Sequence, residues 1–266
     1  MKTTETFDYQ GYMVAKNLFS QLDIETLTKI VDRIHDQWLN ENRADFIEHK
    51  LVNMHSLTNP RYFANHEPER LLFFQTIASN RLVKLLNSMF GDEVYFHNTQ
   101  LFFNPFENQR LPYWHRDMQY SPIDDSILKD EQQKMVNLHV RIPLIQEKGV
   151  ELIPVTHKRW DTELERNVRL EMNGHKNSED LPGAKLIELK PGDVLIFSAQ
   201  MIHRGNYHLN QSRKALDLCV GKHHPFTSKY IDECTLPNTD ELEQIVNNQW
   251  YKMAREIVAN NKMQPI

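Results

Sequence analysis

Residues 191–203 read PGDVLIFSAQMIH, a tight turn followed by a short apolar run that ends in a histidine. A Pro-Gly turn before β-branched and aromatic residues is typical of a β-strand. Similar strand-like runs precede and follow it, at 94–104, 111–120, 135–145, 150–153, 184–189 and 214–220. Many short strands at this spacing predict a mainly β fold, an antiparallel barrel or jelly roll.

Helical patterns flank this β region. Apolar residues at steps of three and four predict a helix over about 23–39, and residues 80–90 predict a second, with Asn80 at its N-cap. Asn238 is a plausible cap for a last apolar stripe near the end of the chain. We therefore expect one domain over 1–266. Its parts are a helical N-terminal part (about 1–92), a β core (about 93–221) and a C-terminal helical extension (about 222–266).

Composition narrows the class of protein. The chain has 31 Lys and Arg against 36 Asp and Glu, a net charge of −5 that argues against nucleic acid as the main partner. No apolar run is long enough to span a bilayer, and the N-terminus lacks a basic segment followed by an apolar one. Two cysteines suggest a reducing compartment. We expect a cytoplasmic protein with neither a nucleic-acid nor a membrane partner, and its oligomeric state is open.

The strands at 135–142 and 213–220 each have one polar and one apolar face. Asn137, His139 and Arg141 share a face of the first, and Asp217 lies on the polar face of the second. A solvated sheet face explains this pattern. An inverted barrel, with helices over the apolar face and polar groups lining the mouth, also explains it. The flanking helices supply the cover that the second arrangement needs.

Residues 113–117 read YWHRD, and in a strand His115 and Asp117 would project from the same face. An imidazole and a carboxylate side by side can ligate one metal ion, although H-x-D alone occurs by chance. His203, at the end of the apolar run, is the candidate third ligand. Two histidines and one carboxylate form a facial triad that leaves three positions open on a ferrous ion. Arg213, ten residues later, can bind a remote carboxylate of a co-substrate.

On these residues, on LIPVTHK at 152–158 and on the run from 191 to 218, the chain resembles the phytanoyl-CoA dioxygenase family of iron(II)/2-oxoglutarate oxygenases. The resemblance covers about 94–220 and implies a double-stranded β-helix of the cupin type. It implies His115, Asp117 and His203 as iron ligands, Arg213 as the anchor of the 2-oxoglutarate C5 carboxylate, and Asn137 as a second 2-oxoglutarate contact.

The activity that the resemblance implies is hydroxylation of a small molecule, with O2 and 2-oxoglutarate as co-substrates and release of succinate and carbon dioxide. Related halogenases have a small residue where this chain has Asp117, so hydroxylation is favoured over halogenation. Two positions depart from the family pattern. The usual Pro-Gly-Ser-His turn reads Pro154-Val155-Thr156-His157, and the spacing from His203 to Arg213 is a residue shorter than in some relatives.

Substrate contacts are predicted more broadly, from side chains on the polar faces or beside a ligand. The candidates are Asn98, Gln100, Trp114, His139, Arg141 and Asp217. Five of them have a structural alternative: a core position for Trp114, solvation for the two amides, and an ion pair between strands for Arg141 and Asp217. For His139 the alternative is a hydrogen-bonding role. Two other functions stay open, a cupin-like isomerase or hydrolase using Zn²⁺ or Mn²⁺, and a non-catalytic metal- or ligand-sensing protein. The isomerase or hydrolase would have no need of a carboxylate anchor at Arg213, and an intact ligand set with an intact anchor weighs against the non-catalytic protein.

Overall fold

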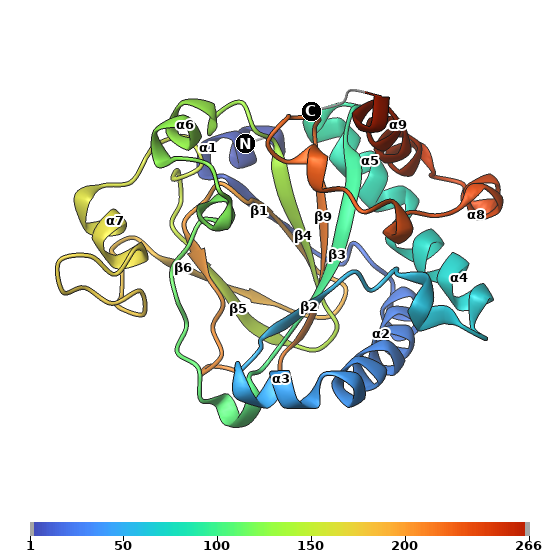
Figure 1. Ribbon diagram of the computed structural model, residues 1–266, viewed down its shortest axis with the longest axis horizontal. Coiled ribbons are helices and arrows are strands. Elements are labelled where there is room, and N and C mark those ends of the chain that lie inside the picture. Colours follow the sequence, from blue (N-terminus) through green and yellow to red (C-terminus); the bar gives the residue numbers. More distant parts are fainter. Residues whose placement is uncertain (1–2, 264–266) are drawn as a thin grey trace.

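The computed structural model describes residues 3–263, which form two antiparallel sheets with helices around them (Figure 1). The larger sheet has the order β1 (Tyr12–Ala15), β7 (Val194–Ser198), β4 (Asn137–Pro143), β9 (Lys214–Gly221), β3 (Tyr95–Phe103) and β2 (Asn53–His55). The smaller sheet has the order β6 (Lys185–Leu189), β5 (Glu147–Leu152) and β8 (His203–Arg204). The predicted jelly roll is confirmed.

Helices gather on one side of the larger sheet (Figure 1). These are α2 (Gln21–Glu41), α4 (Glu67–Ile77), α5 (Asn80–Phe90) and α9 (Gln249–Met263). The remaining helices are α1 (Thr3–Gln10), α3 (Arg43–Glu48), α6 (Asp125–Glu131), α7 (Glu163–Arg169) and α8 (Thr239–Gln244). Within residues 3–263, none of these helices combines the length and the hydropathy that a bilayer crossing requires.

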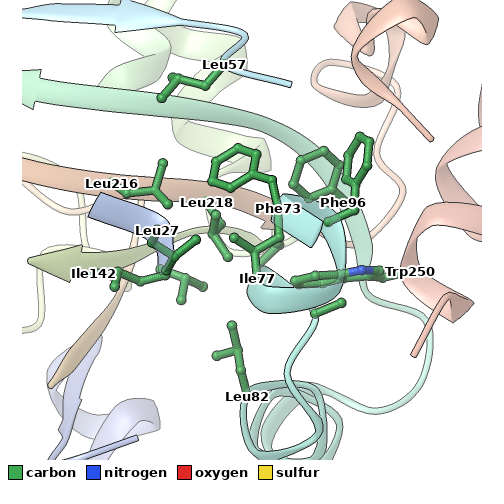
Figure 2. Packing of buried hydrophobic residues seen from close by; sticks show 14 of the residues in the cluster. Leu27, Leu57, Phe73, Ile77, Leu82, Phe96, Ile142, Leu216, Leu218 and Trp250 are labelled. Atoms are coloured by element: carbon green, nitrogen blue, oxygen red, sulfur yellow. The ribbon is translucent and has the colours of Figure 1, made fainter. Parts of the chain in front are cut away.

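The main hydrophobic core lies between those four helices and the outer face of the larger sheet (Figure 2). Phe73 and Ile77 of α4 pack there with Leu216 and Leu218 of β9. Because side chains alternate along a strand, this packing turns His139, Arg141 and Asp217 to the opposite face, between the two sheets. The polar strand faces are therefore interior, and the second of the two arrangements open from the sequence is the one the molecule adopts.

The strongly periodic elements agree with the sequence pattern. The buried face of α2 is the predicted one, and the predicted strands at 94–104 and 135–145 contain β3 and β4. The N-cap of α5 differs by one residue, because Ser79 rather than Asn80 accepts a hydrogen bond from Leu82 N. The last apolar stripe is split between α8, which Asn238 caps, and α9.

The strand expected over 111–120 is nearly absent. Only His115 forms a β-bridge, and Asp117–Tyr120 is a 3₁₀ turn, η3. Pro112 has no N–H to give to a ladder, and the side chain of Gln119 bonds the Arg116 N–H, which favours a turn. Two strands that the sequence did not predict, β1 and β2, extend the edges of the larger sheet and are only four and three residues long.

Candidate metal centre

His115 and His203 face each other across an isolated antiparallel bridge. Each backbone N–H donates to the other residue's carbonyl at 3.0 Å, and the two ring centroids are 4.2 Å apart. The Nδ1 atom of His115 donates to Tyr113 O at 3.1 Å, and that of His203 donates to Met201 O at 3.0 Å. Since a carbonyl only accepts, these bonds put the proton on Nδ1 and leave both Nε2 lone pairs free for a metal.

Asp117 completes the cluster from the first position of η3. Its Oδ1 lies 3.6 Å from His115 Nε2 and 3.3 Å from His203 Nε2. One ligand atom from each of the three residues lies within 4.8 Å of the others. Ligands about 2.1 Å from one ion and at right angles are about 3 Å apart, so the cluster fits a divalent cation with little movement.

The ionisation states also suit a cation. Burial, and next the nearby His203, lower the pKa of His115 to about 3, so its imidazole is neutral. Burial alone would raise the pKa of Asp117, but His139 and His203 outweigh it and hold that pKa well below its usual range. The neutral His115 imidazole, the His203 imidazole and the Asp117 carboxylate together match the donor set of a facial-triad iron site.

The second oxygen of Asp117 is bound by His139 of β4. His139 Nε2 lies 2.6 Å from Asp117 Oδ2, and His139 Nδ1 lies 3.3 Å from Asp217 Oδ2. The ring stacks on Phe197, with centroids 4.8 Å apart and planes inclined by 12°. Burial opposes protonation of His139, but Asp117 and Asp217 outweigh it and raise its pKa to about 10.

A chain of buried ion pairs leads from Asp217 to Arg213. Arg141 donates to Asp217 Oδ1 at 2.8 Å and to both oxygens of Glu147, at 2.9 Å and 2.5 Å. Glu147 Oε1 also accepts from Arg213 Nε at 2.6 Å. The two arginines outweigh the effect of burial and lower the pKa of Glu147 to about 2. Cations and anions therefore alternate from Arg213 to Asp117.

Arg213 has one terminal nitrogen, NH1, that is buried and has no hydrogen-bond partner among residues 3–263. Gly205 lies against this guanidinium, and a Cβ there would come within 2.8 Å of NH1. Glycine at 205 thus leaves room for the arginine head. A buried N–H without a partner costs free energy, so NH1 is suited to a bound anion.

Two cavities meet at Asp117, His139 and Gln100. The first, of about 360 Å³, contains the His115, Asp117 and His203 side chains and extends to Arg213. The second, of about 200 Å³, also reaches Asp117 and is lined by Asn137 and Cys219 of the sheet and by Phe226, Thr227 and Tyr230. The three clustered side chains and Arg213 thus line one cavity, and Asn137 lines the other.

Of the other residues predicted to contact the substrate, some line a cavity and others do not. Gln100 lines both cavities, and Arg141 and Asp217 line the first, where they are paired with each other. Asn98 instead donates to Ser56 Oγ at 3.1 Å. Trp114 is fully buried in a separate apolar cluster and donates to Glu179 O, outside both cavities.

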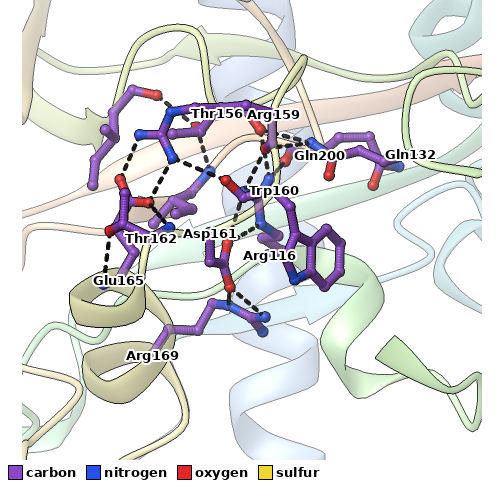
Figure 3. A network of polar contacts seen from close by, with 12 residues as sticks. Arg116, Gln132, Thr156, Arg159, Trp160, Asp161, Thr162, Glu165, Arg169 and Gln200 are labelled. Atoms are coloured by element: carbon purple, nitrogen blue, oxygen red, sulfur yellow. Dashed lines mark hydrogen bonds and ion pairs between the residues drawn. The ribbon is translucent and has the colours of Figure 1, made fainter. Parts of the chain in front are cut away.

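Arg116, between two of the clustered residues, points away from them into a second polar network (Figure 3). It donates to Asp161 Oδ1 at 2.9 Å and to the carbonyls of Thr156 and Gln200. Asp161 is fully buried and also binds Arg169. The network ties the segment that carries His115 and Asp117 to the turn at 154–157 and to the residues before His203.

That turn has an unusual backbone. Val155 has φ 71°, a left-handed conformation that is rare for a β-branched residue. The following residue, Thr156, is fully buried, and its Oγ1 accepts from Ile202 N at 3.0 Å. The glycine missing from this turn in the sequence is therefore replaced by a strained valine.

Sequence reasoning did not identify Glu147, Gly205 or Asp161. Nothing in the sequence around Glu147, which reads Glu147-Lys148-Gly149, marks this acid as buried. Gly205 could have been noticed, because it lies two residues after a candidate ligand. Asp161 lies in an irregular loop, and nothing in the sequence marks it as buried.

Comparisons with known proteins agree with this geometry. A model of the family described as phytanoyl-CoA dioxygenase (PhyH) matches residues 7–215. An ectoine dioxygenase of Sphingopyxis alaskensis is 22% identical over 227 residues, which are 79% of this chain and 71% of that protein.

Two solved structures share the fold. EctD from S. alaskensis with 2-oxoglutarate and 5-hydroxyectoine has a TM-score of 0.55 at 19% identity, over 83% of this chain and 75% of its own. HygX from Streptomyces hygroscopicus, with nickel and 2-oxoglutarate bound, has a TM-score of 0.57 at 14% identity, over 84% and 87% of the two chains.

Proposed function

The chain belongs to the phytanoyl-CoA dioxygenase family, and on that premise we propose that it is an iron(II)- and 2-oxoglutarate-dependent dioxygenase that hydroxylates a small molecule. Succinate and carbon dioxide are the co-products. One observation supports this more than any other. Arg213, which has a buried terminal nitrogen without a partner, lines the same cavity as His115, Asp117 and His203. An anion that reached both ends of this cavity would satisfy the arginine and still contact a bound cation.

The residues of the chain have separate tasks in this proposal. His115, Asp117 and His203 would hold iron(II), which when bound supplies the activation of 2-oxoglutarate and dioxygen. Arg213 binds the C5 carboxylate, with Glu147 keeping its Nε engaged so that only the terminal nitrogens are available. Asn137, which lines the second cavity, is then better suited to contact the primary substrate than 2-oxoglutarate.

The second cavity suits the primary substrate because it touches Asp117 and is lined by few charges. The described side chains there include Leu138, Ala199, Val220 and Phe226. Burial lowers the pKa of His97 to about 4 and raises that of Cys219, so both are neutral at pH 7. A compact, uncharged molecule with one or two hydrogen-bonding groups fits this lining. Gln100 would contact it from the wall shared by the two cavities.

Hydroxylation is the outcome that Asp117 favours over halogenation. A halide bound to the metal needs the position that a carboxylate would fill, and here the carboxylate is present and held by His139. The rival metal isomerase or hydrolase has no use for a buried guanidinium beside the metal cavity.

Neither cysteine of the chain forms a disulfide, which supports a cytoplasmic location.

Anaerobic titration of the iron(II)-loaded protein with 2-oxoglutarate tests the proposal. Chelation should give a visible charge-transfer band that saturates at one equivalent, and His115→Ala should abolish it. Glutarate, which has both carboxylates but no keto group, is the matched control and should give no band. A wild-type protein that binds iron(II) but shows no band at saturating 2-oxoglutarate would contradict the proposal.

A further inference from the structure

We propose that His139 is a positioning residue that holds Asp117 as a one-oxygen metal ligand and so keeps a coordination position free for dioxygen. The inference rests on the proposed function and concerns a contact that the metal-ligand pattern does not specify. It starts from the two oxygens of Asp117, which have different surroundings. Oδ1 faces the Nε2 atoms of His115 and His203, whereas Oδ2 accepts a 2.6 Å hydrogen bond from His139.

The number of oxygens through which Asp117 binds decides how many coordination positions stay free on the metal. Two imidazoles and one carboxylate oxygen leave three positions on a six-coordinate ion, enough for a chelating 2-oxo acid and dioxygen. Carboxylates also bind through both oxygens. If Asp117 bound the metal through both oxygens, the protein would occupy four of the six coordination positions. 2-Oxoglutarate would then fill the last two and leave none for dioxygen. The hydrogen bond from His139 opposes this, because it holds Oδ2 turned towards the imidazole and uses one of its lone pairs.

His139 is well fixed for the task. Its ring lies flat on Phe197, and its other nitrogen is 3.3 Å from Asp217 Oδ2. Asp217 is fixed in turn by Arg141, and both are almost completely buried, at 1% exposure each. His139 thus cannot swing away from Asp117 without breaking contacts on its other side. A residue held this firmly can set the orientation of the carboxylate it touches.

The test separates metal binding, 2-oxoglutarate binding and access to the last position. His139→Phe keeps an aromatic ring on Phe197 but removes the donor. His139→Gln keeps an N–H. The matched control is His35→Phe, because His35 is a partly buried histidine that packs against Phe103 and lines neither cavity. Nitric oxide is the probe for the open position of the iron(II)–2-oxoglutarate complex, read by electron paramagnetic resonance.

We expect His139→Phe to bind Co(II) and 2-oxoglutarate within about threefold of the wild type, but to bind nitric oxide at least tenfold more weakly. His139→Gln and His35→Phe should keep all three affinities within about threefold. Unchanged nitric oxide binding in His139→Phe overturns the inference. A parallel loss of all three affinities also overturns it, because His139 would then only support the fold of the site.

A crystal structure of the Mn(II)-bound His139→Phe protein provides a readout that does not depend on 2-oxoglutarate. Both Asp117 oxygens should lie within bonding distance of the metal in the variant and only one in the wild type. If His139→Phe does not fold, Asp217→Asn, which loosens His139 from behind, should shift Asp117 in the same direction. A charge-transfer band in the wild type with one-oxygen coordination in both proteins refutes the role of His139 and leaves the proposed function intact.

Discussion

At the scale of single residues, the site depends on which atom each partner occupies. Backbone carbonyls accept hydrogen bonds from Nδ1 of His115 and His203, and His139 donates one to Oδ2 of Asp117. Glu147 accepts a hydrogen bond from Nε of Arg213. In each case the partner leaves one defined atom for a metal or an anion. The chemistry of the site therefore depends on the groups that hydrogen-bond to the clustered side chains as much as on those side chains themselves.

Replacing Arg213 should weaken 2-oxoglutarate binding without removing the metal. We expect Arg213→Ala to lose about 1.5–3 kcal/mol of 2-oxoglutarate affinity, the strength of hydrogen bonds to a charged group. The charge-transfer titration measures this, with iron(II) affinity as the internal reference. Arg166→Ala, at a half-exposed arginine far from the cavity, is the control. Equal 2-oxoglutarate affinity in Arg213→Ala and the wild type would move the anchor to another residue.

Ionised Glu147 should make the free energy of unfolding fall as the pH is lowered through the acid range. Its pKa is about 2 in the folded protein and about 4.3 in an unfolded chain. The stabilisation of the folded state by ionised Glu147 is therefore complete above about pH 4.3 and is lost as the pH falls towards 2. A difference of this size corresponds to roughly 3 kcal/mol. The difference in free energy of unfolding between wild type and Glu147→Gln, from urea titrations, should be constant from pH 7 to 5 and shrink below that. A difference that grows on acidification would contradict this.

At the scale of elements, the turn at 154–157 carries strain that the metal site does not need. A β-branched residue in the left-handed region costs about 1–2 kcal/mol, and glycine removes that cost while adding entropy to the unfolded chain. We expect Val155→Gly to raise the free energy of unfolding by up to about 1 kcal/mol. Val155→Ala, which keeps the strained φ, should give no gain. Destabilisation by Val155→Gly would mean that the valine side chain contributes more by packing than it costs in strain.

How much was predictable differs from element to element. The strands around residues 138 and 196 and the helix around Ile30 were predicted because their apolar residues repeat regularly. The segment at 111–120 was misjudged because its residue types suit a strand, whereas Pro112 and the Gln119 side chain favour a turn. The chain partners of Arg213 could not be predicted, because whether a charge in a strand is paired or solvated depends on the opposite strand.

At the scale of the whole molecule, one hydrophobic core joins the helices to the larger sheet, so neither should unfold alone. We expect Phe73→Ala, at a fully buried core position, to cost about 3–5 kcal/mol. Leu72→Ala, one residue earlier and 44% exposed, should cost less than about 0.5 kcal/mol. Urea unfolding followed by far-ultraviolet circular dichroism and by tryptophan fluorescence measures both.

The two probes should report a single coincident transition in the wild type and in Phe73→Ala. A helical signal lost at lower urea than the fluorescence change would show that the helices form a separate unit. That result would also contradict the prediction that residues 1–266 are one domain.

The second cavity is lined in part by Phe226, Thr227 and Tyr230, which lie beyond residue 215, where the match to the family ends. His115, Asp117, His203 and Arg213 all lie within the matched stretch. Under the proposed function, exchanging these three side chains between homologues would therefore alter part of the wall around the primary substrate and leave the proposed iron and 2-oxoglutarate contacts unchanged.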